Sequence, residues 1–521
     1  MKRILPAPPS LTLLPAFIAV PVLIEVCAGL HAGGLNVLTE FLHAAISPSL
    51  DRDVLVSAWR GLQVTLVIAL LSWVTSTLVG IGLGLLSSDA FGSIIRAPCW
   101  MALGMRRLLA IPRAIHELIW GLLLLQVMGL SVWVAILAIT IPYAALVARV
   151  LADQIDSLPR DTLTAMSQLG AKPVPAFLTA LGPPMAPVLL SYCGYRLECA
   201  LRGATLLGVF GLGGLGTDLQ LTMQSLQFRE LWTGLWMLAA VMISLEQLLR
   251  WWRLQLKQPG IAASLMIKSL LGMIIVFGCS LCWLFQLDLD VQIGFSLRGL
   301  PLPSLDALSQ ALIELPWLPL IGETLLITLL AAAIAIGLPP LGLMLFPNRF
   351  GSNVQSMLWT LLRLIPTPLI ALLLLLATLP SLGLAAMALG LHNVGIMGRL
   401  LREGLDQQGD DKHEAFRAAG VGVRSAWLYG YLSPQSASYL AFSAYRTDVI
   451  LRETAVVGLV GGAGLGWQLL ESLSAFNWAE VVVVLVVFVS LTMIGETICD
   501  RFRHHWLSNA EQKRFRSMSV A

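Results

Sequence analysis

Long apolar runs alternate with short polar connections along almost the whole chain. A transmembrane helix needs about 20 mostly apolar residues, and runs of this kind recur throughout the sequence. Their pattern predicts twelve spans, near residues 11–30, 58–87, 108–128, 130–148, 186–209, 231–249, 264–286, 318–346, 356–378, 380–398, 436–460 and 478–499. Because four of the runs touch their neighbours through very short turns, counts from ten to thirteen stay open.

The composition agrees with this pattern. Of the 521 residues, 57% are hydrophobic and 12% are charged, and the mean hydropathy is +0.81. Soluble proteins carry roughly 25% charged residues. The chain is therefore expected to be an integral membrane protein of the all-α class, a polytopic bundle of transmembrane helices. A net charge of +3 is too small to indicate a nucleic-acid partner.

Lysine and arginine gather in alternate connections between the predicted spans. The opposite connections hold only Arg52, Arg60, Arg229 and Arg298. The positive-inside rule then places both termini in the cytoplasm. The first apolar run, which follows Met1-Lys-Arg, is also compatible with a cleaved signal peptide, and its removal would leave the remaining topology unchanged.

The sequence repeats itself at an offset of 250 residues, without gaps over the best-matched stretch. Tyr195-Arg196 matches Tyr445-Arg446, and the same offset relates further positions, among them Arg113 and Arg363, Arg149 and Arg399, Gly170 and Gly420, Pro184 and Pro434, and Arg202 and Arg452. Two permease-like repeats, 1–257 and 258–521, are predicted, each with six spans. An even number of spans gives both repeats one orientation, with a pseudo-two-fold axis along the membrane normal.

One glycine-rich stretch, Gly211-Leu-Gly213-Gly-Leu-Gly216, formally matches the dinucleotide fingerprint G-x-G-x-x-G. The second copy has Ala463 in place of the middle glycine, and no strand pattern precedes either copy. The fingerprint has meaning only in a strand–turn–helix context, so we expect gate or packing glycines that permit positive φ and close helix approach. They are Gly208, Gly211, Gly214 and Gly216, with Gly458, Gly461, Gly464 and Gly466.

Each repeat has an inward-facing loop of about 35 residues between its fourth and fifth spans, at about 152–185 and 402–435. Both loops contain a short helical segment, a glycine, a second apolar-faced segment, and proline before the next span. Two short helices that project from the membrane suit docking into a groove on a soluble partner. An ordinary solvated connector is the alternative, but recurrence in both repeats favours docking.

These loops resemble the "EAA" coupling loop of ABC-importer permeases, in which Glu-Ala-Ala precedes a glycine and later a Leu-Pro pair. The matching positions are Glu414, Ala415, Ala419, Gly420, Leu432 and Pro434 in the second repeat, and Ala165, Leu169, Gly170 and Pro183 in the first. The stretch after each loop, and the segments from Arg113 and Arg363, are similar to the phosphonate-importer permeases. The chain resembles two such permeases, of type I importer fold, fused in tandem.

Some positions depart from the family pattern. Thr164 replaces the acidic residue found at Glu414, and His116 stands where the second repeat has Pro366. Pro434 comes one residue later than the family spacing. From these changes we expect the first loop to grip its partner less firmly and the fold to be unaffected, and the resemblance does not extend to the exact substrate.

The resemblance implies a transport subunit of a bacterial inner membrane and no catalytic residues. Two cytoplasmic ABC ATPase subunits would dock on the two loops, and a periplasmic or lipid-anchored solute-binding protein would deliver the substrate. The dipeptide Gly-Lys of an ATP-binding P-loop does not occur in this chain, so a separate chain would hydrolyse ATP. No cofactor and no metal are expected, and the remaining partner is membrane lipid.

Six arginines lie within or at the edges of apolar spans: Arg113, Arg196, Arg202, Arg363, Arg446 and Arg452. An arginine near the centre of a spanning helix costs about 2.5–3.5 kcal/mol on insertion scales. Local pairing is one explanation, because Glu198 and Asp448 precede Arg202 and Arg452 by four residues, and Glu117 follows Arg113. The other is a path that attracts an oxyanion such as phosphonate, which a guanidinium recognises well.

Other functions remain as alternatives. An importer for phosphite, thiamine or ferric iron would have the same architecture. An ion-driven secondary transporter can also have two parallel halves, but it would not need paired coupling loops. A membrane enzyme is disfavoured, because the repeats share no nucleophile–base arrangement and the histidines and cysteines form no cluster.

Overall fold

The computed structural model describes residues 10–95, 97–256, 262–287, 303–406, 411–461 and 463–518. Within these ranges the chain is helical, and its one β-type pairing is an isolated antiparallel bridge between Leu30 and Thr378. The all-α prediction is therefore confirmed.

The described helices account for eleven of the twelve predicted spans by length and composition. Eight helices are long and apolar enough to cross a membrane, and three further pairs pass the same test together but bend at a short break. The one predicted span left over, near 436–460, is helical but carries Arg446, Asp448, Arg452 and Glu453. These charges keep it out of the apolar set, and twelve spans stay a prediction.

The chain divides into two compact units, each of which is described by itself. We call Ala44–Pro301 the first-repeat unit, and Met1–His43 with Leu302–Ala521 the second-repeat unit. The sequence repeats were expected to meet at 257/258, which lies outside the described residues. The compact units follow the repeats except for their first spans, which have exchanged places.

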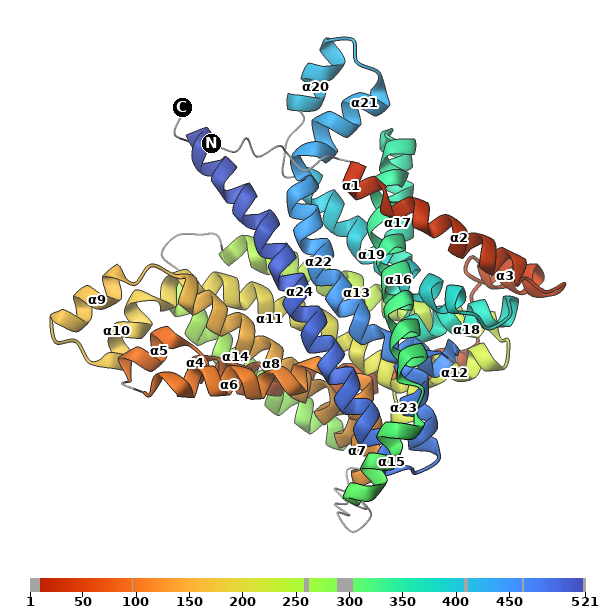
Figure 1. The fold of residues 1–521 in the computed structure, drawn as a ribbon, viewed down its shortest axis with the longest axis horizontal. Helices are drawn as coiled ribbons and strands as arrows, with labels where there is room; N and C mark the ends of the chain where they lie inside the picture. The colour runs from red at the N-terminus through yellow and green to blue at the C-terminus, as the bar shows by residue number, and fades with distance from the viewer. Residues whose placement is uncertain are drawn as a thin grey trace. The chain divides into compact units, whose positions relative to one another are not determined.

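The first-repeat unit packs around α4 and α8 (Figure 1). These helices approach closely because Gly80 leaves no room for a side chain: an added Cβ would lie 2.6 Å from Cβ of Val147. Small residues bring membrane helices together in this way. The elements are α4 (Arg52–Leu86), α5 (Asp89–Ile94), α6 (Cys99–Ala114), α7 (Glu117–Met128), α8 (Val132–Ser157), α9 (Asp161–Gln168), α10 (Pro173–Ala180), α11 (Gly182–Leu207), η1 (Gly208–Leu212), α12 (Leu215–Gln224), α13 (Phe228–Leu256) and α14 (Ala262–Gln286).

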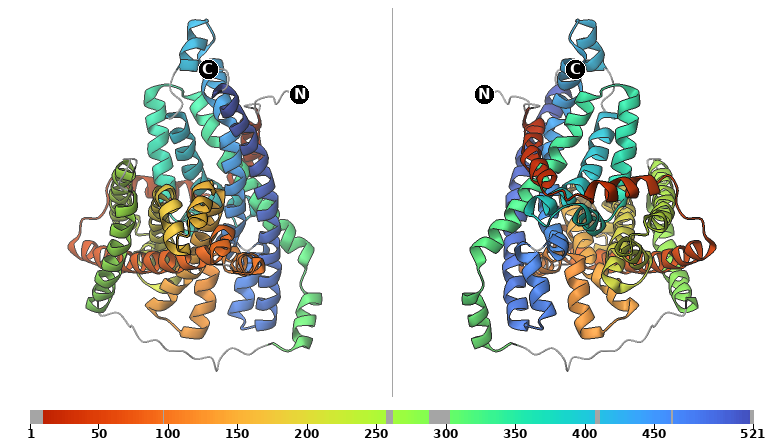
Figure 2. Two further views of the ribbon diagram at one scale, coloured as in Figure 1. Left: turned by 90° about the vertical axis from the view of Figure 1, so that its left-hand side faces the viewer. Right: turned by 90° about the vertical axis from the view of Figure 1, so that its right-hand side faces the viewer.

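The second-repeat unit packs around α16 and α19, where Gly390 meets Ile334 as Gly80 meets Val147. Its α20 and α21 project beyond the ends of α19 and α22 (Figures 1 and 2). The elements are α1 (Ser10–Leu13), α2 (Pro15–Ala28), α15 (Leu305–Glu314), α16 (Trp317–Leu345), α17 (Arg349–Leu364), α18 (Thr367–Ala377), α19 (Leu382–Asp406), α20 (Asp411–Ala418), α21 (Val423–Trp427), η3 (Leu428–Leu432), α22 (Ser433–Gly461), α23 (Gly464–Ser474) and α24 (Trp478–Met518); α3 (Gly34–Ala44) ends at the boundary of the two units.

The N-terminal helix α2 packs on α16 and α19, although it precedes the first repeat in sequence. Its Glu25 accepts a hydrogen bond from the backbone N–H of Gly383 at 3.2 Å, and Gly337 leaves space for the backbone of Ala16. In the same way α14 packs on α4 and α11 of the first-repeat unit. Each unit is thus completed by the first span of the other repeat.

Candidate functional site

The first coupling loop consists of α9 and α10, joined at a sharp turn on Gly170. This residue has φ of +82°, a conformation that glycine adopts without steric cost. The N–H groups of Gly170 and Ala171 donate to the carbonyls of Ser167 and Met166 at 3.1 Å, which satisfies the last carbonyls of α9. The predicted pair of short helices around a glycine is therefore present.

The second coupling loop repeats this geometry with α20 and α21. Gly420 has φ of +79°, and the N–H groups of Gly420 and Val421 donate to the carbonyls of Arg417 and Phe416 at 3.0 and 3.1 Å. Residues 407–410 of the predicted loop lie outside the described residues. The two loops thus share one fold, as the 250-residue offset predicts.

The residues singled out in these loops lie mostly on exposed surface. Leu169 and Ala419 stand at equivalent positions before the turn glycines, and the side chain of Leu169 is 87% exposed. Pro183 lies in the first turn of α11, where a proline costs no hydrogen bond, and Pro434 lies where η3 continues directly into α22. The exposed positions are Ala165, Leu169, Gly170, Glu414, Ala415, Ala419 and Gly420. Their contact with an ATPase stays a prediction.

The two loops are held by different parts of their units. Phe177 of α10 packs edge-on against Phe91 of α5, with ring centroids 5.2 Å apart. In the second loop, the ring of His413 instead stacks on Tyr431 at 4.5 Å. Gly430 approaches the backbone of His413 so closely that an added Cβ would lie 2.8 Å from its Cα.

The glycine-rich stretches close a tight turn in each unit. Gly211 and Gly214 have φ of +84° and +87°, and Gly464 has φ of +73°. Gly208 and Gly216 lie in helical segments that touch: a Cβ on Gly216 would sit 2.0 Å from the carbonyl oxygen of Thr205. In the second copy Gly458 and Gly466 meet in the same way, and Gly461 is the last residue of α22. A packing role explains these positions.

The helix that follows each glycine turn begins on a threonine from the unit's long helix. The N–H of Leu215 donates to Oγ1 of Thr65 at 2.9 Å, and the N–H of Leu465 donates to Oγ1 of Thr324 at 2.9 Å. Such a hydroxyl satisfies an orphan donor at a helix N-terminus. Thr65 and Thr324 therefore play the same part in the two repeats, although they are not related by the offset of 250 residues.

Arg196 of α11 is 5% exposed and is surrounded by tyrosines. Its Nε donates to the hydroxyl of Tyr192 at 2.9 Å. Its Cζ lies 5.0 Å from the ring centroid of Tyr143, 5.2 Å from that of Tyr192 and 5.7 Å from that of Tyr195. The Tyr143 hydroxyl in turn lies 3.4 Å from Oε1 of Glu117.

Arg446 occupies the equivalent position on α22 and is 6% exposed. Its Nη2 donates to Oε1 of Glu453 at 2.7 Å, and its Nε donates to Oδ1 of Asn393. The amide of Asn393 donates to the other carboxylate oxygen of Glu453 at 2.8 Å. Arginine, amide and carboxylate thus form a closed buried network between α19 and α22.

A comparison of these networks shows that a carboxylate has changed helices between the repeats. Tyr143 and Asn393 are equivalent positions, but Glu453 corresponds to Gly203 and Glu117 corresponds to Thr367. A Cβ added to Gly203 would lie 3.5 Å from Oε1 of Glu117. The first repeat therefore places a carboxylate beside Tyr143 from α7, where the second repeat places one beside the equivalent Asn393 from α22.

The outer arginines of the same helices form the local pairs that their spacing predicts. Arg202 Nη2 lies 2.6 Å from Oε1 of Glu198. Arg452 pairs with Asp448 and lies 3.8 Å from Glu496. The predicted i,i+4 explanation is thus confirmed for these two arginines.

Arg113 and Arg363 lie at the last turns of α6 and α17, and both are buried. Each precedes a break at which the chain bends, by 85° before α7 and by 97° before α18. Residues four apart face each other only along one continuous helix. Because the chain bends between Arg113 and Glu117, these two residues do not share a helical face. Glu117 instead lies beside Tyr143 and 3.5 Å from Nε2 of His116.

Several residues of these networks were not singled out from the sequence. Tyr143, Tyr192, Asn393 and Glu453 look like isolated polar positions within apolar runs. The aligned repeats nevertheless carried a signal, because an acid lost at one position, Gly203, is matched by an acid gained at another, Glu117. Among the described residues, no group of three or more His, Cys, Asp or Glu is placed to hold a metal ion.

Residues 80–258 match the protein family described as "Binding-protein-dependent transport system inner membrane component". The phosphate-import permease PhnE of Mycolicibacterium smegmatis is 25% identical over 426 residues, which cover 76% of this chain and 77% of that protein. The phosphite transport system permease PtxC of Stutzerimonas stutzeri is 29% identical over 120 residues, 23% of this chain and 44% of PtxC. PhnE2 of Escherichia coli K12, named as a cryptic phosphonate transport permease, is 27% identical over 121 residues, 23% of this chain and 99% of PhnE2.

Proposed function

We propose that the chain is an inner-membrane permease component of a binding-protein-dependent transport system, because residues 80–258 match that family and PhnE is similar over 76% of the chain. On that premise the chain forms the translocation path of an ATP-driven importer for a small phosphorus oxyanion. Both halves of the path come from one polypeptide, since the repeats at 1–257 and 258–521 each supply a bundle and a coupling loop. The protein spans the membrane several times, with both termini in the cytoplasm.

The duplicated coupling loops are the observation that carries this proposal. Each presents two short helices around a glycine of positive φ, with exposed side chains at Leu169 and Ala419. Two ATPase subunits would each receive one loop, and a solute-binding protein would deliver cargo on the opposite side. ATP hydrolysis takes place in the ATPase chains, and rigid-body movement of the loops opens the path alternately to each side.

The buried arginines support an anionic cargo. We propose Arg196 as the residue best suited to attract it, because the Tyr192 hydroxyl and the ring of Tyr143 lie beside its guanidinium, and a phenol O–H can also donate to a phosphonate oxygen. Arg202, Arg446 and Arg452 each form an ion pair with a carboxylate. These arginines, with Arg113 and Arg363, remain candidates along the path. Phosphonate is the proposed cargo, with phosphite, phosphate, thiamine and ferric iron as alternatives.

Single cysteines in a background that lacks the native cysteines test this arrangement. Leu169→Cys and Ala419→Cys are expected to react with a membrane-impermeant maleimide only from the cytoplasmic side, and to crosslink to the ATPase. Leu305→Cys is the control, because its exposed position in α15 belongs to a connection on the opposite side. The variants are also reconstituted into lipid vesicles with the ATPase and the binding protein. ATP-dependent uptake of labelled phosphonate is then measured, with phosphite, phosphate, thiamine and ferric iron as competitors.

Labelling of either loop position from outside would refute the proposal. Uptake that continues after ATP is depleted would favour an ion-driven secondary transporter instead. Competition by thiamine or ferric iron but not by phosphorus oxyanions would leave the importer mechanism in place and overturn the proposed substrate class.

A further inference from the structure

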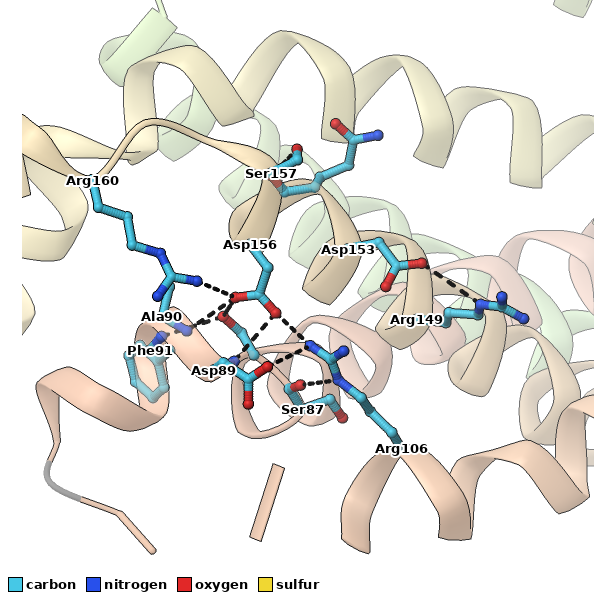
Figure 3. Close-up of polar contacts among 12 residues, drawn as sticks. Ser87, Asp89, Ala90, Phe91, Arg106, Arg149, Asp153, Asp156, Ser157 and Arg160 are labelled. Atoms are coloured by element: carbon cyan, nitrogen blue, oxygen red, sulfur yellow. Dashed lines mark hydrogen bonds and ion pairs between the residues drawn. The ribbon is translucent and has the colours of Figure 1, made fainter. Parts of the chain in front are cut away.

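Asp156, near the C-terminal end of α8, is a hub of polar contacts that no part of the mechanism described so far uses (Figure 3). One carboxylate oxygen accepts hydrogen bonds from Ser88 Oγ and Ala90 N, both at 2.9 Å. The other accepts from Asp89 N at 3.2 Å and pairs with Nη2 of Arg106. Its side chain is only 17% exposed.

The first three contacts hold α5 in place. This helix has six residues, and isolated helices shorter than about 12 residues are marginal in water. A carboxylate that accepts from the first backbone N–H groups stabilises such a helix start, since those donors have no partner within the helix. The position of α5 is therefore set by the side chain of Asp156.

The helix α5 in turn supports the first coupling loop. Ala90 and Phe91 pack against Ala176 and Phe177 of α10, and Leu163 of α9 belongs to the same buried cluster. Displacement of α9 and α10 therefore presses on α5. Because protein interiors are close-packed, such a cluster moves as a body rather than deforming.

Arg106 connects the same hub to α6. Its Nε donates to the carbonyl of Ser87 at 2.7 Å, its Nη2 pairs with Asp156 and lies 3.6 Å from Asp89. At the far end of α6 lies Arg113, followed by the bend into α7. The path from loop to membrane thus runs through α5, Asp156 and α6.

The second-repeat unit has a different arrangement at the equivalent place. Its α16 runs to Leu345, and only residues 346–348 separate it from α17, so the described residues contain no counterpart of α5. Asp406 corresponds to Asp156, but its side chain is 66% exposed and accepts from Arg402 Nε at 3.3 Å. The second loop rests instead on η3 and α22 through His413 and Tyr431.

We propose that Asp156 is a positioning residue that transmits movement of the first coupling loop to α6, and that the second coupling loop acts through η3 and α22 instead. The two halves of the transporter are then mechanically unequal. The inference rests on the proposed function, because it takes the loops to be the sites at which the ATPases act.

The test uses the full chain reconstituted with its ATPase and binding protein, and compares Asp156→Asn with the matched variant Asp406→Asn. Asparagine keeps the shape of the side chain but removes the charge that pairs with Arg106, and it replaces one of the two acceptor oxygens by an NH2 donor. We expect Asp156→Asn to bind the ATPase and hydrolyse ATP, while ATP consumed per substrate imported rises about tenfold, the size expected when hydrogen bonds to a charged group are lost. Asp406→Asn should change this ratio less than about twofold, as for a surface pair.

Two further variants keep the result interpretable. Asp156→Glu restores the charge and should recover much of the coupling ratio, which a defect in overall folding would not do. If Asp156→Asn does not fold, Arg106→Lys tests the same link, since lysine keeps the charge but lacks the planar fork whose Nε and Nη2 reach Ser87 and Asp156 separately.

A normal coupling ratio in folded Asp156→Asn or Arg106→Lys would overturn the inference, and so would an equal loss in Asp406→Asn. Failure of the unaltered chain to bind an ATPase would count against the proposed function itself. The two failures are therefore distinguishable.

Discussion

The carboxylate that has changed helices between the repeats gives a quantitative prediction. We expect Glu117→Thr and Gly203→Glu to destabilise the protein separately but to compensate for each other when combined. The double variant gives the first repeat the residues that the second repeat has at Thr367 and Glu453.

The magnitude follows from the distances. In Glu117→Thr, Tyr143 loses its carboxylate partner, at a cost of about 2 kcal/mol for a buried hydrogen bond to a charged group. In Gly203→Glu, a second carboxylate enters beside the first, because Cβ at position 203 lies 3.5 Å from Oε1 of Glu117. Two like charges about 4 Å apart repel by about 4 kcal/mol at an effective dielectric constant of 20.

The double variant carries one carboxylate in the same region, reached from α11 instead of α7. We expect its stability to lie within about 1 kcal/mol of the unaltered chain, against about 6 kcal/mol if the two single costs added. The contacts around Gly203 leave room, since the atoms nearest an added Cβ lie at 3.5 to 3.6 Å.

Thermal unfolding in detergent, followed by size-exclusion chromatography, measures these differences. With about 2–4 °C per kcal/mol for a unit of this size, the single variants should lose roughly 4–8 and 8–16 °C, and the double variant only about 2–4 °C. Thr367→Glu with Glu453→Gly is the reciprocal control in the second repeat. Additive losses in the double variant would refute the idea that the two acids serve one buried arginine network.

Two further predictions concern glycine packing and a partly buried acid. Gly216→Ala should lower stability by about 3 kcal/mol through overpacking against Thr205, while Gly82→Ala, with no atom within 4 Å, should be neutral or slightly stabilising in the same thermal assay. Burial raises the pKa of Asp218 in α12, and a hydrogen bond from Ser57 opposes this rise. The stability that this acid contributes is present at low pH and is lost as the pH rises through the raised pKa. Asp218→Asn should therefore be more stable than the unaltered protein at pH 7 and should lose that advantage near pH 4. An advantage that persists at low pH would contradict this reasoning.

The sequence predicted the architecture well where the offset of 250 residues carries information. Glycines, prolines and short amphipathic segments recur at fixed positions, and their backbone requirements are local, so the turns on Gly170 and Gly420 were predictable residue by residue. The i,i+4 pairs of Arg202 and Arg452 are local in the same sense.

The exchange of first spans between the units was not predictable in this way. Both α2 and α14 are apolar on many faces, and lipid is as apolar as a helix surface, so hydropathy does not select a neighbour. The neighbour of α2 is instead determined by single close contacts, such as the hydrogen bond that Glu25 accepts from the N–H of Gly383. Such a contact becomes visible only when the two helices are placed together.

The buried networks show why the aligned repeats should be compared by charge as well as by identity. A position-by-position comparison finds Glu117 opposite Thr367 and Gly203 opposite Glu453, and scores both as mismatches. In the bilayer an unbalanced charge costs several kcal/mol. A buried arginine that is kept in both repeats therefore requires an acid nearby, but that acid can come from different helices. The first repeat places that acid at the start of α7, just after the bend that follows α6, and α6 is the helix that carries Arg106. Arg446 instead bonds Asn393 of α19 and Glu453 of α22. If the loops transmit movement as proposed, we expect the position of this acid to make the two halves respond differently to their loops.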